Sequence, residues 1–223
     1  ALESLERNEK IRTTRKDTLR LVPTKLLGRV FSGDIADACT VDQHYPFANG
    51  EHPDITSYVL VSGPDQNQRI EGSVLAISTK TPDGKKVLHI RANNPRERLK
   101  SIYDTNDLVK GMLDALIETA KKGGYDYVTL PLDAKNASCS NRGYVHDYYH
   151  ANYKDAPKIL LENSPATNFN GYDNWNPEGH YPSVVIWSRN DEKDSADSEE
   201  GVAGLKNGGQ GWKEGVARVP KRL

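Results

Sequence analysis

The sequence predicts a mixed α/β fold of the α+β type, in which an antiparallel meander is combined with a crossover helix. Three segments rich in β-branched and aromatic residues, 56–63, 69–79 and 86–93, follow one another between short turns. A segment with apolar residues at helical spacing comes next, and a further strand candidate at 125–132 follows it. Only 36% of the 223 residues are hydrophobic. We therefore expect one folded domain with polar extensions.

Turn residues mark the limits of the three strand candidates. TSYVLVSG is followed by the turn sequence GPDQNQ, and RIEGSVLAIST is followed by KTPDGKK. The third segment, KVLHIRAN, precedes the loop NNPRERLKSIYDTND. Strands joined by turns this short pair with their neighbours in antiparallel directions. A three-stranded meander is the expected result.

The segment DLVKGMLDALIETAKKGG is predicted to be an amphipathic helix. We expect Asn106 or Asp107 to cap its start, and Gly123–Gly124 to end it. The crossover is long enough to make the strands before and after it parallel. Two further strand candidates, APKILLEN and YPSVVIWSRN, follow later. The apolar residues of the helix recur every three or four positions: Leu108, Met112, Leu113, Leu116, Ile117 and Ala120.

The two ends of the chain differ in composition from its middle. Residues 1–18 are charged and are predicted to form an N-terminal arm, which leaves 19–190 as the folded domain. Residues 191–223 are rich in Asp, Glu, Ser, Gly and Lys, which predicts a polar tail. Both ends are candidates to dock on a protein partner, with Trp212 as an aromatic contact in the tail.

Charge and hydropathy disfavour several classes of protein. The formal net charge of -1 gives no reason to expect nucleic-acid binding. No apolar run approaches the roughly 20 residues that span a bilayer, and no signal-peptide pattern is present. The two cysteines, Cys39 and Cys139, lack metal-ligand spacing. We expect a soluble, cytoplasmic protein with no resident metal.

The segment NRGYVHDYYHANY, 141–153, contains four tyrosines and two histidines. Its aromatic residues suit a packing face, a binding site or a placed proton donor. His146 and His150 are four residues apart, a spacing that chelates metals on helices. Without a third ligand nearby, we expect a surface pair instead.

The order of these elements resembles that of the GNAT superfamily of acyl-CoA-dependent N-acyltransferases over residues 56–190. RIEGSVLAI is similar to the family's third strand, and DLVKGMLDALIETAKKGGYDYVTLPLDAKN to its crossover helix and fifth strand. The resemblance implies that the two parallel strands splay apart near Ile90 and Leu130, with acetyl-CoA or another acyl-CoA lying between them. It also implies an amine acceptor, either a small molecule or a protein.

The resemblance gives the tyrosine segment a catalytic meaning. Counting from Asn141 places Tyr148 where the family has a tyrosine, and counting from Asn136 places Tyr144 near that position. A phenol there would protonate the thiolate that leaves when an amine attacks a thioester. Glu71 and His89 are the candidate bases that would take the amine proton. Strand alternation decides which of the two faces the cleft, and the sequence leaves both open.

The chain departs from the family at the cofactor loop. The family pattern Arg/Gln-x-x-Gly-x-Gly/Ala at the helix start holds a pyrophosphate by backbone N–H groups. Asp104, Asp107 and Val109 stand at those positions here. The remaining cofactor-binding candidates come from the strand candidate 86–93, from the Arg-rich loop after it and from the tyrosine segment. They are Ile90, Arg91, Arg96, Arg98, Lys100 and Asn141.

Two functions therefore stay open. One is an N-acyltransferase that moves an acyl group, expected to be acetyl, from acyl-CoA to an amine. The alternative is a catalytically inactive GNAT-like domain that serves as a binding or structural component of a larger assembly. A thiol hydrolase using Cys39 with His44 or His52 is a third class, but no family signature surrounds that cysteine.

Overall fold

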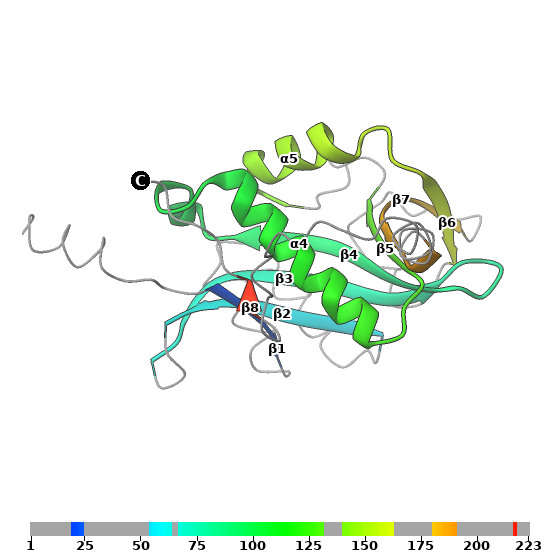
Figure 1. The fold of residues 1–223 in the computed structure, drawn as a ribbon, viewed down its shortest axis with the longest axis horizontal. Coiled ribbons are helices and arrows are strands. Elements are labelled where there is room, and N and C mark those ends of the chain that lie inside the picture. Colours follow the sequence, from blue (N-terminus) through cyan, green and yellow to red (C-terminus); the bar gives the residue numbers. More distant parts are fainter. Residues whose placement is uncertain are drawn as a thin grey trace, which may run out of the picture.

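A computed structural model describes residues 19–24, 54–63, 67–131, 140–162, 180–190 and 216–217. Within these residues, one mixed sheet of eight strands is packed against two α-helices (Figure 1). The sheet is mostly antiparallel, so the predicted α+β class is confirmed. The strand order across the sheet is β6-β7-β5-β4-β3-β2-β1-β8.

The meander predicted from the turns is present and has one additional strand. The predicted strands correspond to β2, β3 and β4, and β1 pairs antiparallel with the outer edge of β2. Among the described strands, only β4 and β5 form a parallel pair, as the crossover predicted. The strands are β1 (Leu19–Thr24), β2 (Ile55–Ser62), β3 (Arg69–Lys80), β4 (Lys86–Pro95), β5 (Tyr127–Pro131), β6 (Lys158–Glu162), β7 (His180–Ser188) and β8 (Val216–Ala217).

Three helical segments accompany the sheet: a 3-10 turn η2 (Glu97–Ser101), the long helix α4 (Thr105–Lys122) and the shorter α5 (Gly143–Tyr153). Figure 1 shows α4 crossing one face of the sheet, with α5 alongside it. The two-residue β8 pairs with β1, so part of the predicted polar tail joins the sheet. The predicted N-terminal arm, together with Cys39, His44, His52, Asn136, Cys139 and Trp212, lies outside the described residues.

The start of α4 differs from the prediction. Asp104 is the N-cap, and its carboxylate accepts hydrogen bonds from the backbone N–H of Asn106 at 2.9 Å and of Asp107 at 3.3 Å. The predicted caps, Asn106 and Asp107, are therefore the donors. A carboxylate at this position also interacts favourably with the positive end of the helix dipole.

The end of α4 lies where the glycines predict it. Gly124 has φ of +72°, in the left-handed region that glycine adopts without steric cost. The N–H of Tyr125 donates to the carbonyl of Ala120, and that of Gly124 to Lys121. This pair of hydrogen bonds is a Schellman motif, which satisfies carbonyls that the helix leaves unpaired.

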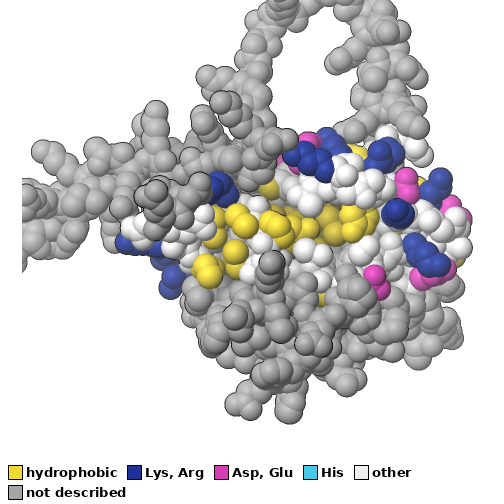
Figure 2. All heavy atoms as spheres, turned by 90° about the horizontal axis from the view of Figure 1, so that it is seen from below, with side chains coloured by type: hydrophobic (Ala, Val, Ile, Leu, Met, Phe, Trp, Pro, Cys, Tyr) yellow, Lys and Arg dark blue, Asp and Glu magenta, His cyan; other side chains and the backbone are white. Residues whose placement is uncertain are grey.

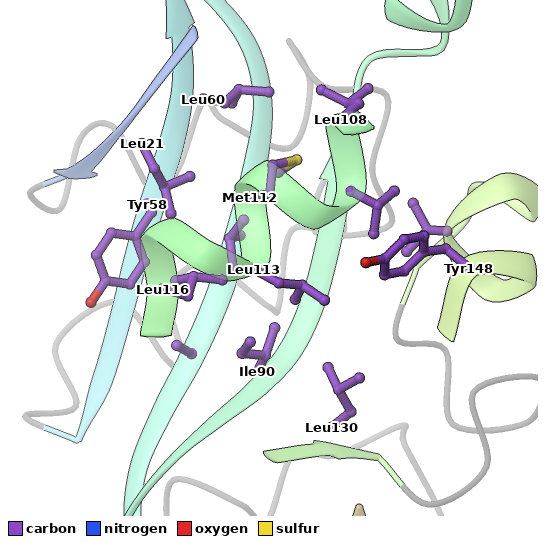
Figure 3. Close-up of a cluster of buried hydrophobic side chains, with 14 of the residues drawn as sticks. Leu21, Tyr58, Leu60, Ile90, Leu108, Met112, Leu113, Leu116, Leu130 and Tyr148 are labelled. Carbon is purple, nitrogen blue, oxygen red and sulfur yellow. The ribbon is translucent and has the colours of Figure 1, made fainter. Parts of the chain in front are cut away.

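The main core lies between α4 and the sheet. Figure 3 shows Met112 and Leu116 on α4 pointing toward the strands, where Leu60 and Ile90 meet them. These side chains are almost fully buried. Burial of one aliphatic side chain of this size contributes about 1.5–3 kcal/mol. The helical spacing of the apolar residues thus determines which face of α4 meets the sheet.

The opposite face of the sheet carries a second, smaller buried cluster. Ile55, Leu75, Ile77 and Ala92 form it, one or two from each of the strands β2, β3 and β4. Figure 2 shows the molecule from below, where hydrophobic side chains form a band with Lys and Arg side chains at both ends. The described sheet therefore has apolar side chains on both faces.

We predict that Gly124→Ala lowers the free energy of unfolding by about 1–2 kcal/mol, because an alanine Cβ is strained in the left-handed conformation. Urea denaturation measures this change. Gly143→Ala is the matched control, since Gly143 lies in α5 with open space around it and no positive φ. Equal effects of the two substitutions would contradict the role given to Gly124.

Candidate functional site

The strands β4 and β5 pair over a short distance. Their register joins Val87 to Tyr127, Leu88 to Val128 and His89 to Thr129. Beyond His89, β4 continues for six more residues, 90–95, and no described strand pairs with the edge of β4 that faces β5. We call this region the β4–β5 divergence. Backbone groups on an unpaired strand edge are available to a ligand or to other parts of the chain.

A β-bulge accompanies the divergence. The register of β3 with β4 joins Ala76 to Ile90 and Leu75 to Ala92, so Arg91 is the additional residue in β4. A bulge bends its strand and increases the local twist, which favours separation of β4 from β5. The resemblance predicted that the strands separate near Ile90, and the pairing ends at the residue before it.

Polar residues that precede α5 bridge the end of β4. The Asn94 side-chain oxygen accepts hydrogen bonds from Ser140 Oγ at 3.2 Å and from the backbone N–H of Asn141 at 3.0 Å. Arg142 Nε donates to the Pro95 carbonyl at 2.7 Å. Asn141, a cofactor-binding candidate, is thus brought beside the divergence by its backbone. These side-chain contacts occur at the part of β4 that does not pair with β5.

Two buried polar atoms beside this bridge have no hydrogen-bond partner among the described residues. The Asn93 side chain is fully buried and donates from Nδ2 to the Tyr149 hydroxyl at 3.1 Å, while its Oδ1 is unpaired. The Tyr144 hydroxyl is buried and unpaired as well. A buried polar group without a partner costs about 1–3 kcal/mol. Each of these atoms therefore needs a partner from beyond the described residues, which the rest of the chain, water or a ligand would supply.

Burial raises the pKa of Tyr144 to about 12. The nearby Glu97 carboxylate also raises this pKa, and Arg142 acts in the opposite direction. At neutral pH the phenol is therefore protonated, which is the state that a general acid requires. Tyr144 was the alternative acid in the sequence, and its hydroxyl has no hydrogen-bond partner among the described residues.

The preferred sequence candidate, Tyr148, has a different environment. Its ring is nearly buried and makes edge-to-face contacts with Tyr149 and Tyr153, with centroids 6.5 and 6.3 Å away. Figure 3 shows the ring directed from α5 toward α4. Burial raises its pKa, and its hydroxyl shares a hydrogen bond with that of Tyr153. Lys110 and Asp114 of α4 also act on this pKa, which places the hydroxyl at the interface between the helices.

The first candidate base, Glu71, is held in an ion pair. Its carboxylate is 1% exposed and accepts hydrogen bonds from Ser62 Oγ at 2.7 Å and from Arg98 Nε at 3.0 Å. The second guanidinium nitrogen of Arg98 binds the other carboxylate oxygen. Both carboxylate oxygens of Glu71 thus accept hydrogen bonds, and these bonds hold the Arg98 guanidinium against β3.

The second candidate base, His89, is fully buried and contacts Thr129 Oγ1 through Nδ1 at 3.0 Å. Burial lowers its pKa to about 3, with Arg91 as a second cause. His89 lies opposite Ile77, which belongs to the smaller cluster. Since directly opposite residues share a sheet face, the imidazole points away from α4 and α5. Its role as a base stays a prediction, as does that of Glu71.

The basic residues of the Arg-rich loop are largely paired. Arg98 binds Glu71, and Lys100 forms an ion pair with Glu97. Arg96 donates its backbone N–H to the Glu71 carbonyl at 2.7 Å. Two of the three cations proposed to contact phosphates are thus neutralised by carboxylates of the chain itself.

Among the described residues, His146 and His150 are not joined by further potential metal ligands. The Nε2 of His146 lies 2.7 Å from the Ser140 carbonyl oxygen, and His150 is exposed. No group of three or more potential metal ligands occurs within the described residues.

The chain matches no family model, and it has no significant match among curated proteins or solved structures. No helix in the described part of the chain is long and apolar enough to cross a membrane. The geometry around the β4–β5 divergence is therefore the main basis for a functional conclusion.

We predict a pH dependence of stability that arises from His89. Its pKa is about 3 in the folded state and about 6.5 when unfolded, so the unfolded chain binds more protons between these values. The contribution is fully present above pH 6.5, and it falls by about 1.4 kcal/mol for each pH unit below that. Urea unfolding between pH 5 and 7.5 measures the slope.

The variant His89→Gln should lose this part of the slope. His150→Gln is the control, because the exposed His150 is solvated in both states. A wild-type slope in His89→Gln would contradict the assignment of a buried, neutral imidazole.

Proposed function

We propose that this chain is a GNAT-like N-acyltransferase that moves an acyl group from a thioester such as acetyl-CoA to an amine. The observation that carries the proposal is the β4–β5 divergence with its unpaired polar atoms, Asn93 Oδ1 and the Tyr144 hydroxyl. A thioester arm that contains amide groups would pair with the open edge of β4 as an added strand does. The N–H of such an amide suits Asn93 Oδ1.

In the proposed reaction, the nitrogen of an uncharged amine attacks the thioester carbonyl carbon. A C–N bond forms, the C–S bond breaks, and the sulfur leaves as a thiolate. Tyr144 donates its proton to that thiolate and regains one from water. The amine nitrogen loses one proton, so that a neutral amide and a free thiol are the products.

Tyr144 is preferred to Tyr148 as the acid for two reasons. The Tyr148 hydroxyl is engaged with Tyr153 at the α4–α5 interface. The Tyr144 hydroxyl has no such partner among the described residues, and it lies near Arg142, which binds the last residue of β4. A donor near the end of β4 is better placed for a sulfur held along that strand.

The environments of the two candidate bases favour proton loss to water. Glu71 is engaged with Arg98 and Ser62, and a histidine with a pKa of about 3 is a weak base. The acceptor amine must then arrive uncharged, because a protonated amine has no lone pair. The rate would rise with pH until the pH reaches the pKa of the acceptor amine.

A specific observation also favours the second candidate, an inactive binding or structural domain. Asp104 and Asp107 stand at the start of α4, where the resemblance requires a pyrophosphate site. Carboxylates repel that group. If this candidate holds, no acyl thioester will stabilise the fold and no thiol will be released.

We predict that Tyr144→Phe reduces kcat by roughly 10²-fold or more, the usual contribution of a general acid. Thiol release from acetyl-CoA with lysine and peptide N-termini as acceptors is the measurement. Tyr148→Phe is the matched control, and its kcat should change only a few-fold because its hydroxyl serves packing between the helices.

Binding is checked separately by thermal unfolding. A thioester that binds the folded state raises Tm by mass action, and Asn93→Leu should weaken this effect by removing the unpaired amide. The absence of any Tm shift at millimolar acetyl-CoA and S-acetylpantetheine would contradict the enzyme proposal.

A further inference from the structure

We infer that the site recognises the acyl-pantetheine arm of its donor and not the nucleotide end of CoA. This inference rests on the proposed function and narrows its substrate class. Two independent features of the described residues carry it: the hydrogen-bond state of the α4 N-terminus, and the pairing of the cations around it.

The N-terminus of α4 is closed to an added anion. Two of its first-turn N–H groups, those of Asn106 and Asp107, already donate to the Asp104 carboxylate. A phosphate would have to displace this internal carboxylate to reach the same donors. The side chain of Asp107 adds a second negative charge in the first turn.

The segment that continues from β4 offers no surplus of positive charge. Residues 96–107 contain three basic and three acidic residues. Arg98 and Lys100 are held by Glu71 and Glu97, and Arg142 lies 3.6 Å from Glu97. A donor that leaves the divergence at the end of β4 passes this segment. A pyrophosphate would meet Arg96, two cations already paired with carboxylates, and the carboxylates of Asp104 and Asp107.

The divergence itself offers the opposite chemistry. The β4 edge presents backbone groups from Ile90 to Asn94, whereas the Pro95 carbonyl is bound by Arg142. Asn93 Oδ1 is a fully buried acceptor without a partner among the described residues. Amides and a thioester match these uncharged groups. The stretch has one cation, the buried Arg91. A single guanidinium does not neutralise a polyphosphate, and burying its remaining charges without paired cations is costly. The site therefore recognises the acyl-pantetheine arm of the donor.

The test compares S-acetylpantetheine with acetyl-CoA on the full chain. We expect their kcat/KM values to agree within about threefold, because the nucleotide adds no binding energy to the transition state. An advantage of acetyl-CoA of tenfold or more, about 1.4 kcal/mol, would overturn the inference while leaving the acyltransferase proposal intact. If neither thioester is used or bound, the proposed function itself fails.

A second measurement needs no catalysis. Thermal unfolding with 3′-phosphoadenosine 5′-diphosphate, the nucleotide half of CoA, should show no change in Tm at millimolar concentration. A rise in Tm would show that the fold recognises the nucleotide end, and would overturn the inference.

A gain-of-function variant tests the cause. Asp104→Ser with Asp107→Asn keeps a hydroxyl cap on α4 and removes both carboxylates. It should raise the affinity for 3′-phosphoadenosine 5′-diphosphate several-fold and leave that for S-acetylpantetheine unchanged. Glu118→Gln removes a carboxylate from the other end of the same helix and should change neither. No gain in the double variant would contradict the role given to the two aspartates.

Discussion

The limited pairing of β4 with β5 is the constraint on which the rest of the structure depends. Along one edge, β4 is paired with β3 over its whole length, and along the other it is paired only from Val87 to His89. The bulge at Arg91 turns the strand at the point where the second set of pairs ends. Backbone groups that lose a strand partner need another, since unpaired buried groups are costly. Arg142 Nε supplies one such partner, to the Pro95 carbonyl.

Two asparagine side chains join the end of β4 to α5 and to the residues that precede it. Asn is uncommon in strands because its side chain competes for backbone hydrogen bonds, and β4 nevertheless has two in succession. Asn94 binds the backbone and side chain of the segment before α5, and Asn93 binds Tyr149. The polar end of β4 thereby holds α5 in place. A local departure from strand composition of this kind is typical of functional sites.

The charges near the end of β4 form internal pairs. Glu71, buried at the bulge in β3, binds Arg98, and Glu97 binds Lys100. A buried carboxylate is stable only when it is paired and hydrogen-bonded, so Arg98 is committed to the fold. The same pairing that stabilises η2 offsets two of the three positive charges of the loop, which leaves less positive charge for a phosphate ligand. Stability and ligand choice are thus linked through the same residues.

Local patterns determined the meander, the crossover helix and its glycine end, because turn residues, strand composition and helical spacing act over a few neighbours. Tyr144 and Tyr148 were site candidates in the sequence as well, whereas Asn93 and Asn94 at the end of β4 were not. The cap at Asp104 is a local contact with Asn106 and Asp107, and the sequence analysis misplaced it by two or three residues. Only the tertiary structure decided that Arg98 neutralises Glu71 and that His89 faces away from both helices. Both depend on strand register or on contacts between distant residues, and a shift of one residue in register reverses the face of every side chain.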